Sequence, residues 1–380
     1  MHIKYILTHP IQYQSPLIKY LVKRGLKIKV LYRSNISVKK YFDPGFGKKI
    51  KWDTNLLRGY NFDFLNFIGP NKVGNIFPIT TEFINKIFND KTNIIWLHGI
   101  KNWYNLCIII LSKFFKKKVF VRDEMHQFSK NRTTINNFLN YLFFQLIDQF
   151  IDVYLAIGTA NKKYYIKNNI DKKKIITVPY TVNNEFFNKK RKKISKNKKI
   201  IFMFAAKLIH RKGADLLLES LILLKKYKDF SLNTKFLIIG DGKLKKKLIK
   251  FSKKNNLKNV SFFRFQNQKK LLKFYQNSDV FIMPSRIEPW GLTVNEAMSA
   301  GNAIISSDKV GSNFDLVKKN INGYTFINNS SKDLAKKILL IHNKRKKIKK
   351  FKSNSLKIIS KWEFSHCYKG LQKALHSIDL

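Results

Sequence analysis

Short apolar runs alternate with helix-forming segments along almost the whole chain. Strands that are separated by helices are typical of a parallel sheet covered by helices, because a parallel pair needs a long crossover connection. The sequence therefore predicts an α/β fold. The strands predicted in the first half of the chain are residues 3–9, 27–33, 93–99, 118–124, 153–158 and 174–179.

A lysine-rich stretch interrupts this alternation near the middle of the chain. Residues 188–199, which read NKKRKKISKNKK, contain almost nothing that a core could bury, and we interpret them as an interdomain linker. The alternation then restarts, and 380 residues are enough for roughly two or three domains. We therefore predict two Rossmann-like, doubly wound domains, residues 1–187 and 200–361, that face each other across a cleft. The strands predicted in the second domain are 200–206, 235–242, 260–265, 280–285 and 303–308.

The most apolar segment of the chain, residues 138–158, is interrupted by Asp148 and Asp152. A membrane span needs about 20 nearly uncharged residues, so we interpret this segment as a buried helix that runs into a strand. The N-terminus lacks a signal-peptide core, and Cys107 and Cys367 have no disulfide-like or metal-like spacing. These features predict a cytoplasmic protein.

The chain is very basic, with 75 Lys and Arg against 23 Asp and Glu and a formal net charge of +52. Clustered basic residues can neutralise phosphate groups, so a nucleic-acid-binding protein is an alternative of another class. No recognition-helix or stacking-sheet motif accompanies the charge, and an AT-rich genome would produce the same abundance of Lys, Asn, Ile and Phe. We expect no nucleic-acid partner. We expect peripheral association with the anionic inner face of the cell membrane, at about 1 kcal/mol per well-placed Lys or Arg.

Two lysines follow the first predicted strand of the second domain. Lys207 and Lys212 stand five residues apart, and a helix is expected to begin just after Gly213. A helix N-terminus and two ammonium groups suit a diphosphate, although in so basic a chain either lysine could be a surface residue. Gly240 ends the next strand, where a glycine allows a ligand to approach the backbone.

Two carboxylates flank a Pro-Trp-Gly turn in residues 284–301, PSRIEPWGLTVNEAMSAG. Glu288 is expected on the loop before a helix, and Glu296 in the first turns of that helix. Each carboxylate can accept hydrogen bonds from sugar hydroxyls. The alternative is two solvent-facing glutamates on an ordinary helix. The backbone amides at the start of the helix suit a phosphate group, and they belong to Gly291, Leu292 and Thr293.

These motifs carry a resemblance to a known family. Residues 285–326 resemble the E-x(7)-E region of family 4 of the retaining glycosyltransferases, which have the GT-B fold. Residues 205–220 are similar to the G-R-L-x(n)-K-G segment of that family, and LIIGDG (237–242) to its following strand. Residues 361–375 look like the C-terminal helix, here about 362–380, that crosses back onto the first domain. A subgroup that acts on bacterial surface polysaccharide or lipopolysaccharide is similar over residues 6–21, 42–65, 94–105 and 156–187.

The resemblance implies a role for each candidate site residue of the second domain. Glu296 would bind the ribose of a nucleotide, and Glu288 would contact a hydroxyl of the donor sugar as a catalytic residue. Lys212 corresponds to the diphosphate lysine of the family. Lys207 stands where the family usually has Arg, which keeps the charge but loses the bidentate fork. Backbone contacts to sugar and phosphate would come from Gly291, Leu292 and Thr293, with Gly240 nearby.

The first domain offers candidates at the ends of three predicted strands. His9 and His98 would face the donor, although a lone histidine is more often packed or exposed than catalytic. Many family members have a catalytic-site histidine where this chain reads VRDEMH (121–126). We include Asp123 and Glu124 with His98 as catalytic candidates. The residues that could replace the family histidine are Arg122, Asp123, Glu124 and His126.

The resemblance implies a retaining glycosyltransferase that moves a sugar from a UDP- or GDP-linked donor to an acceptor hydroxyl. The acceptor would be a glycan or lipid-linked glycan of a bacterial cell-surface polysaccharide. We expect no cofactor and no metal, because lysines and a helix N-terminus can neutralise the leaving diphosphate and no DxD-type motif stands out. A nucleotide-sugar epimerase and a phosphorylase are enzyme alternatives, because they share the two-domain cleft.

Overall fold

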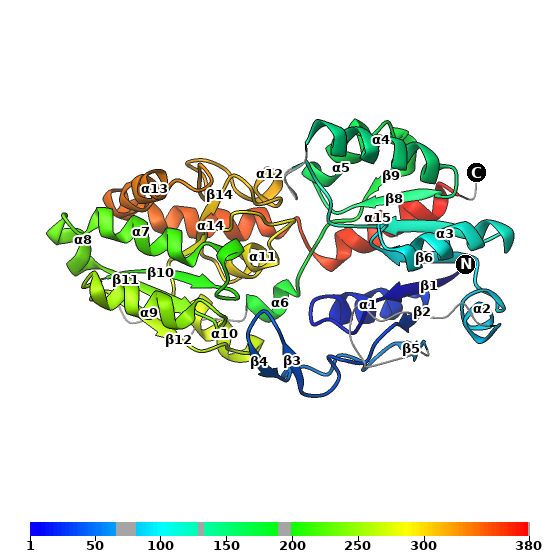
Figure 1. The fold of residues 1–380 in the computed structure, drawn as a ribbon, viewed down its shortest axis with the longest axis horizontal. Helices are drawn as coiled ribbons and strands as arrows, with labels where there is room; N and C mark the ends of the chain where they lie inside the picture. The colour runs from blue at the N-terminus through cyan, green and yellow to red at the C-terminus, as the bar shows by residue number, and fades with distance from the viewer. Residues whose placement is uncertain (66–80, 128–132, 189–198, 379–380) are drawn as a thin grey trace. The chain divides into compact units, whose positions relative to one another are not determined.

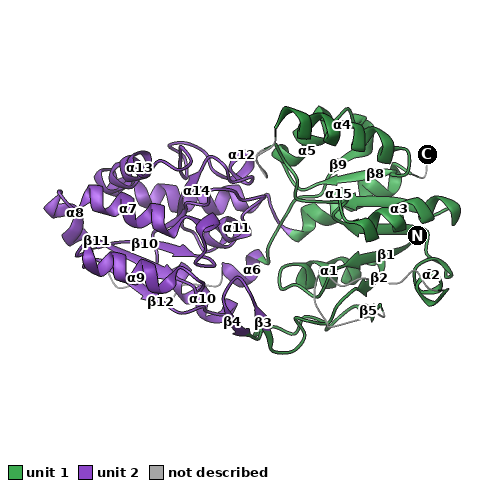
Figure 2. Ribbon diagram, in the orientation of Figure 1, with its two compact units in different colours: residues 1–41, 50–183, 364–380 green, residues 42–49, 184–363 purple. Residues whose placement is uncertain are grey.

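The structure is a computed structural model that describes residues 1–65, 81–127, 133–188 and 199–378. The chain forms two compact units (Figure 2). The predicted linker at 188–199 lies outside the described residues, apart from its first and last positions. The first unit comprises residues 1–41, 50–183 and 364–380, and the second comprises residues 42–49 and 184–363.

The first unit is built on a seven-stranded sheet (Figure 1). Its strands are β1 (His2–Leu7), β2 (Lys27–Tyr32), β5 (Asn61–Phe64), β6 (Ile94–His98), β7 (Lys118–Arg122), β8 (Val153–Ala156) and β9 (Ile175–Thr177). All neighbours are parallel, and their order is β5-β2-β1-β6-β7-β8-β9. The order reverses at β1, and open sheets of this kind bind ligands outside the carboxyl ends of the strands at such a reversal.

Helices cover both faces of this sheet, as its nearly continuous apolar strands require. The helices α1 (Gln14–Lys23) and α15 (Phe364–His376) share one core with Tyr5 of β1. Ile6, the next residue of β1, points into the other core, because successive side chains of a strand face opposite ways. That second core is closed by α2 (Thr81–Phe88), α3 (Trp103–Phe114), α4 (Thr134–Asp148) and α5 (Thr159–Lys167).

The C-terminal helix α15 belongs to the first unit, as the resemblance implies, although the residues before it belong to the second. Its Cys367 thiol donates to the carbonyl of Pro179 at 2.9 Å. A side chain at Gly370 would place its Cβ 2.4 Å from the carbonyl oxygen of Thr177, so the helix lies against β9 at a distance that only glycine allows.

The second unit has a six-stranded parallel sheet of the order β12-β11-β10-β13-β14-β15. The strands are β10 (Ile200–Ala205), β11 (Thr234–Ile239), β12 (Val260–Phe263), β13 (Val280–Met283), β14 (Ala303–Ser307) and β15 (Gly323–Phe326). The order reverses at β10, whose neighbours are β11 and β13. Both sheets confirm the predicted doubly wound α/β fold.

Helices connect and cover the strands of the second unit. The longer ones are α7 (Ala214–Leu224), α9 (Lys245–Lys254), α10 (Gln268–Gln276), α11 (Leu292–Ser299), α13 (Ser331–Asn343) and α14 (Ile348–Ile359). Shorter ones are α6 (Asn184–Phe187), α8 (Lys228–Asn233) and α12 (Asn313–Leu316), with 3-10 turns η2 (His210–Lys212) and η3 (Arg345–Lys347). Phe202 and Phe236 stack in the core with ring centroids 4.7 Å apart.

A hairpin from the first half of the sequence also belongs to the second unit. It is formed by β3 (Tyr41–Asp43) and β4 (Lys48–Ile50), and its residues 42–49 pack with the second unit. The chain therefore passes from the first unit to the second and back within nine residues of Tyr41. The alternation of strands and helices in the sequence does not signal this placement.

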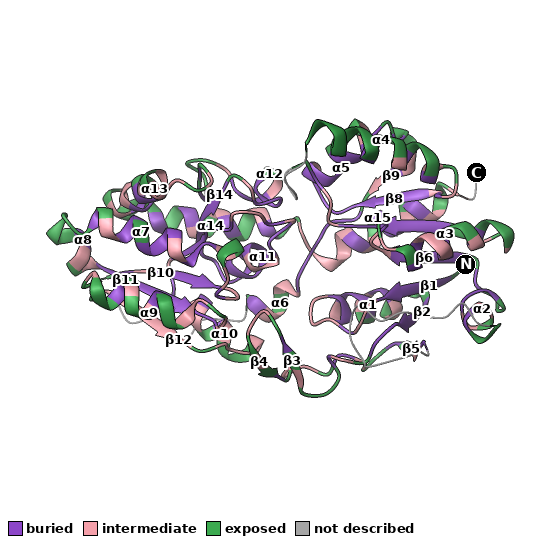
Figure 3. Cartoon of the chain, in the orientation of Figure 1, coloured by how far each residue is buried: buried purple, intermediate pink, exposed green. Residues whose placement is uncertain are grey.

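The burial predicted for the apolar segment 138–158 is wrong for its helix. A helix, α4, does run into a strand, β8, but α4 buries only Asn140, Phe144 and Ile147. Figure 3 shows the rest of α4 as mainly exposed. A helix on the outside of a sheet can bury the side chains of only one face. When apolar residues occur on all its faces, those on the other faces stay exposed to solvent. The large apolar side chains left exposed are Ile135, Phe138, Leu139, Tyr141, Leu142 and Leu146.

Candidate active site

The candidate site of the second unit lies at the carboxyl ends of β10 and β13, which are paired where the strand order reverses. The loop after β10 leads through η2 into α7, and the loop after β13 leads into α11. Two glycines allow close packing here, and the first of them, Gly213, brings the two loops together. Gly213 has φ +72, and a Cβ there would lie 1.9 Å from the carbonyl oxygen of Pro284. Gly291 has φ +93, and a Cβ there would lie 2.9 Å from the sulfur of Met283.

The Pro-Trp-Gly turn is held in place by its tryptophan. The Trp290 side chain is buried, and its indole N–H donates to Asn295 Oδ1 at 2.9 Å. Its ring packs on Trp362 with centroids 5.2 Å apart. The turn therefore has a fixed conformation, and α11 begins directly after Gly291, as predicted.

Glu288 is buried on this turn and pairs with Lys212. The Lys212 ammonium donates to Glu288 Oε2, Ser285 Oγ donates to the same oxygen at 3.4 Å, and Arg211 Nη1 lies 3.9 Å from Oε1. The backbone of Glu288 forms a parallel bridge with Val310, which fixes the loop from its other side. The two residues that the sequence assigns to diphosphate and sugar are therefore in direct contact.

Glu296 is also buried, on the second turn of α11. The Tyr275 hydroxyl donates to its Oε2 at 2.9 Å. Burial raises the pKa of Glu296 to about 7, and the hydrogen bond from Tyr275 opposes that shift. The carboxyl group is therefore divided between its neutral and ionised forms near neutral pH, and a new hydrogen-bond donor would favour the ionised form.

The other predicted residues of the second unit lie at the ends of β10 and β11 and at the start of α11. Leu292 and Thr293 form the first turn of α11, where backbone N–H groups have no partner within the helix. Gly240 follows β11, and a Cβ there would lie 2.0 Å from the carbonyl oxygen of Ala206. Lys207 follows β10 and pairs with Asp43 of the hairpin.

In the first unit, the structure brings together two of the predicted catalytic candidates, His98 at the end of β6 and Glu124 beyond the end of β7. His98 Nε2 lies 3.9 Å from Glu124 Oε1. The other ring nitrogen, Nδ1, lies 3.4 Å from both the Tyr5 hydroxyl and Gln14 Nε2. The imidazole is therefore held on both sides at the carboxyl end of the sheet.

Two tyrosines complete this group, which we call the Glu124 network. The Tyr180 hydroxyl donates to Glu124 Oε1 at 2.5 Å, and the Tyr13 and Tyr180 hydroxyl oxygens lie 3.0 Å apart. Burial opposes ionisation of Glu124, but His98 and Tyr180 outweigh it and lower the pKa of Glu124. An ionised carboxylate only accepts, so the single proton of Tyr180 points to Glu124.

The remaining first-unit candidates make other contacts, and the Arg122 guanidinium lies 4.9 Å from the centre of the Tyr180 ring. Asp123 is buried, and its Oδ1 accepts from Met125 N at 2.8 Å and Asn161 Nδ2 at 3.3 Å. Burial raises the pKa of Asp123 to about 6, against these hydrogen bonds. Arg122 is fully buried and donates to the carbonyls of Val178 and Pro179, while His126 is also buried. His9 is half-buried, with Nδ1 3.0 Å from Thr8 Oγ1.

The sequence did not single out several residues that contact the candidates. Tyr180 follows β9, so a search of every strand end for polar side chains would have found it. Tyr275 lies on α10 and Asp43 on the hairpin, where no local signal relates them to the site.

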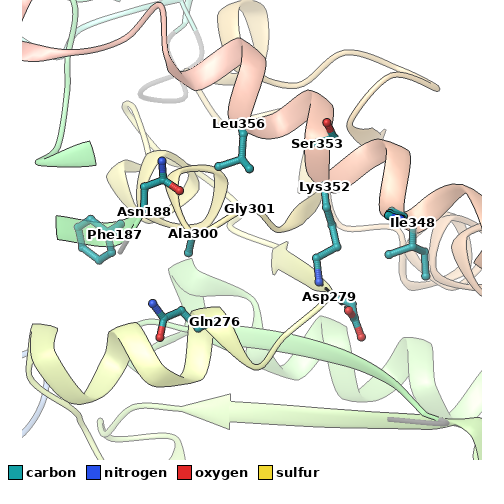
Figure 4. Close-up of a pocket in the computed structure, with 11 residues that line it drawn as sticks. Phe187, Asn188, Gln276, Asp279, Ala300, Gly301, Ile348, Lys352, Ser353 and Leu356 are labelled. Carbon is teal, nitrogen blue, oxygen red and sulfur yellow. Dashed lines mark hydrogen bonds and ion pairs between the residues drawn. The ribbon is translucent and has the colours of Figure 1, made fainter. Parts of the chain in front are cut away.

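A cavity of about 710 Å³ lies elsewhere in the second unit (Figure 4). Phe187, Gly301 and Leu356 line it, and Lys352 donates to Asp279 Oδ1 at 2.7 Å on its wall. Asp279 precedes β13 and Gly301 precedes β14, so this cavity is at the amino ends of the strands. It contains none of the candidate residues.

Among the described residues, no helix has the length and apolar character that a membrane span needs. No group of three or more His, Cys, Asp or Glu side chains is arranged to hold a metal ion in that part of the chain.

Sequence comparison covers the region that carries most of the second-unit site. Residues 185–358 match the family Glycosyl transferases group 1. An uncharacterised glycosyltransferase of Methanocaldococcus jannaschii is 27% identical over 217 residues, which are 56% of this chain and 58% of that protein. A Campylobacter jejuni α-1,4-N-acetyl-D-galactosaminyltransferase, which acts on an undecaprenol-linked glycan by its name, is 27% identical over 57% of this chain and 58% of that protein. The chain thus spans a little over half the length of these two relatives.

Solved structures extend the likeness to the whole chain. Anabaena HepE in complex with UDP has a TM-score of 0.75, 15% sequence identity, and coverage of 99% of this chain and 100% of that chain. HepE has also been solved with UDP-glucose, with a TM-score of 0.72. The fold is GT-B. The sequence match to Glycosyl transferases group 1 is confined to residues 185–358, and the likeness of fold extends beyond it to the first unit.

Proposed function

We propose that the protein is a retaining glycosyltransferase of family 4, of the type that builds bacterial surface polysaccharide, and that its donor is a UDP-linked sugar. The observation that carries this proposal is the contact of Lys212 with Glu288 beside the first turn of α11, at the strand-order reversal of a unit that matches group 1. The UDP and UDP-glucose complexes of HepE support the choice of donor.

Each group of the second-unit site has a role in this proposal. The diphosphate binds the ammonium groups of Lys212 and Lys207 and the backbone amides of Leu292 and Thr293. A hydroxyl of the donor sugar donates to Glu288, and the ribose donates to Glu296. A sugar hydroxyl can replace Lys212 at Glu288 while a phosphate replaces Glu288 at Lys212, so each member of the ion pair gains a new partner.

The transfer step needs no enzyme nucleophile. The bond from the anomeric carbon to the β-phosphate oxygen breaks while the acceptor oxygen bonds to that carbon on the same face, which retains its configuration. The acceptor proton passes to the leaving phosphate oxygen. Lysine charges and the N-terminus of α11 stabilise the negative charge that develops there, and no metal is required.

We assign acceptor binding to the first unit. In this assignment the Glu124 network contacts the hydroxyl groups of the acceptor. The ionised Glu124 carboxylate can accept from an acceptor hydroxyl, and His98 is held beside it by Tyr5 and Gln14. The acceptor proposed is a glycan or a lipid-linked glycan, which the Campylobacter relative supports. The exposed apolar side chains of α4 and the high positive charge support peripheral binding to an anionic membrane, on its cytoplasmic face.

Nucleotide binding to the full-length protein tests the central assignment. UDP and UDP-glucose should raise the melting temperature, because a ligand at a hundred times its Kd stabilises by about 2.7 kcal/mol. Lys212→Ala should remove that effect for UDP and leave any effect of uridine unchanged. Equal loss for UDP and uridine would contradict the diphosphate role. The comparisons do not favour an epimerase, a phosphorylase or a nucleic-acid-binding protein.

A further inference from the structure

The hairpin residues 42–49 place a carboxylate on one of the two lysines of the proposed diphosphate site. Asp43 is buried, and both of its oxygens contact the Lys207 ammonium, Oδ1 at 2.9 Å and Oδ2 at 3.0 Å. Asp43 Oδ1 also accepts the backbone N–H groups of Gly45 at 2.8 Å and Phe46 at 3.0 Å. The carboxylate therefore keeps two hydrogen bonds from its own turn when Lys207 leaves it.

The hairpin encloses the Lys207 side chain closely. A Cβ at Gly45 would lie 2.4 Å from Lys207 Cδ, so only glycine allows this approach. The Lys207 ammonium also lies 5.0 Å from the centre of the Phe46 ring, within the range of a cation–π contact. Lys207 is thus held by the hairpin and, at about one-third exposure, remains open to solvent on one side.

A second set of contacts fixes the hairpin without using Lys207. Lys48 forms an ion pair with Asp241, which also binds Lys245 at 2.5 Å and the backbone N–H of Phe265 at 2.9 Å. The rings of Phe46 and Phe265 pack with centroids 4.6 Å apart. The hairpin can therefore stay in place when the contact between Asp43 and Lys207 is broken.

We propose that Asp43 competes with the diphosphate of the donor for Lys207 and so sets the affinity of the site for nucleotide diphosphates. This proposal rests on the proposed function, because it takes Lys207 as a diphosphate ligand. A diphosphate beside Lys207 places its negative charges near the Asp43 carboxylate, and like charges at close range repel. Binding therefore requires Lys207 to exchange the carboxylate for phosphate, and the Asp43–Lys207 pair opposes binding until it opens.

Calorimetry with UDP and uridine on the full-length chain tests this competition. Asp43→Asn keeps an oxygen that can accept from the N–H groups of Gly45 and Phe46 but removes the charge. It should bind UDP about tenfold more tightly than the parent and uridine equally well. In the Lys207→Ala background, Asp43→Asn should no longer change UDP affinity, because the ammonium group for which Asp43 and the diphosphate compete is absent. Lys48→Met is the matched control: it disrupts the other anchor of the hairpin and should leave the affinity for UDP within about twofold.

The outcomes separate this proposal from the function on which it rests. If the parent binds UDP and Asp43→Asn binds it equally or more weakly, the competition is overturned while the nucleotide site stands. A gain that persists in Lys207→Ala, or that Lys48→Met reproduces, also overturns it, since the hairpin would then act without the Asp43–Lys207 pair. If the parent does not bind UDP, the proposed function fails, and the competition fails with it.

Discussion

The half-buried Lys212 and the buried Glu288 form an ion pair although 76 positions separate them in the chain. Lys212 ends the 3-10 turn before α7, and Glu288 lies on the loop before α11. The pairing of β10 with β13 brings these two loops together. The fold therefore places the residue proposed to bind the diphosphate beside the residue proposed to bind the donor sugar.

The first prediction concerns the stability of this pair. Removal of one partner of a buried ion pair leaves the other charge uncompensated, at a cost of about 3 kcal/mol or more. Lys212→Met should lower the free energy of unfolding by less than this, about 1–3 kcal/mol, because Arg211 remains 3.9 Å from Glu288, and the double variant Lys212→Met, Glu288→Leu should recover most of that loss. Both variants should bind UDP more weakly than the parent. Denaturant unfolding and calorimetry measure the two quantities, and a single variant as stable as the parent would contradict a buried pair.

The second prediction concerns Glu296, whose pKa burial raises to about 7. Between about pH 4.5 and 7 the folded state then holds a proton that the unfolded state has lost, so stability should fall as pH rises through this window and level off above it. The loss should be at most about 3 kcal/mol, and Glu296→Gln should remove it. Unfolding measured across this pH range checks the slope. A slope that persists in Glu296→Gln would assign it to another group.

The ribose role of Glu296 has its own test. Ribose hydroxyls that donate to the carboxylate should lower its pKa, because hydrogen bonds to the charged form favour that form. The chain has seven glutamates, so carboxyl-labelled glutamate should give few enough NMR signals to follow Glu296, with Glu296→Gln for assignment. Addition of UDP should move the titration of Glu296 to lower pH. A Glu296 titration that UDP leaves in place would contradict the contact.

A third prediction concerns Tyr180, which donates to Glu124 at 2.5 Å. This hydrogen bond is one cause of the lowered pKa of Glu124, so Tyr180→Phe should raise that pKa. The same labelled glutamate signals measure the change. Tyr13→Phe is the control, because Tyr13 contacts Tyr180 and not the carboxylate, and should have a smaller effect. An effect of Tyr13→Phe as large as that of Tyr180→Phe would contradict a direct role for Tyr180.

The fourth prediction concerns the exposed apolar face of α4. Leu146 is 69% exposed and Phe138 is 60% exposed, so Phe138→Ser with Leu146→Ser should change the free energy of unfolding little. The variant should lose much of the binding to vesicles that contain anionic lipid, because apolar side chains of a surface helix enter the interface. Ile327→Ser, at a site 65% exposed in the second unit, is the control. Vesicle sedimentation at low and high salt measures binding, and equal binding by variant and parent would contradict this surface.

The parts of the site that follow from local sequence were predicted well. The start of the helix after Gly291 follows from turn chemistry within a few residues. The positions of Glu288 and Lys212 at strand ends follow from the alternation of strands and helices. What these patterns could not supply is the protonation of Glu296, because it depends on the distant Tyr275 and on how deeply α11 is buried.

The sequence by itself determined the α/β class, the doubly wound units and the strand ends that carry the candidate residues, because periodicity and turn residues act over short distances. Only the tertiary structure decided which charges meet. Asp43 reaches Lys207 from 164 positions away, Tyr180 reaches Glu124 across 56, and the apolar residues of α4 were left partly in solvent. Such contacts depend on the packing of whole sheets and loops. The local sequence around each residue therefore does not predict its distant partner.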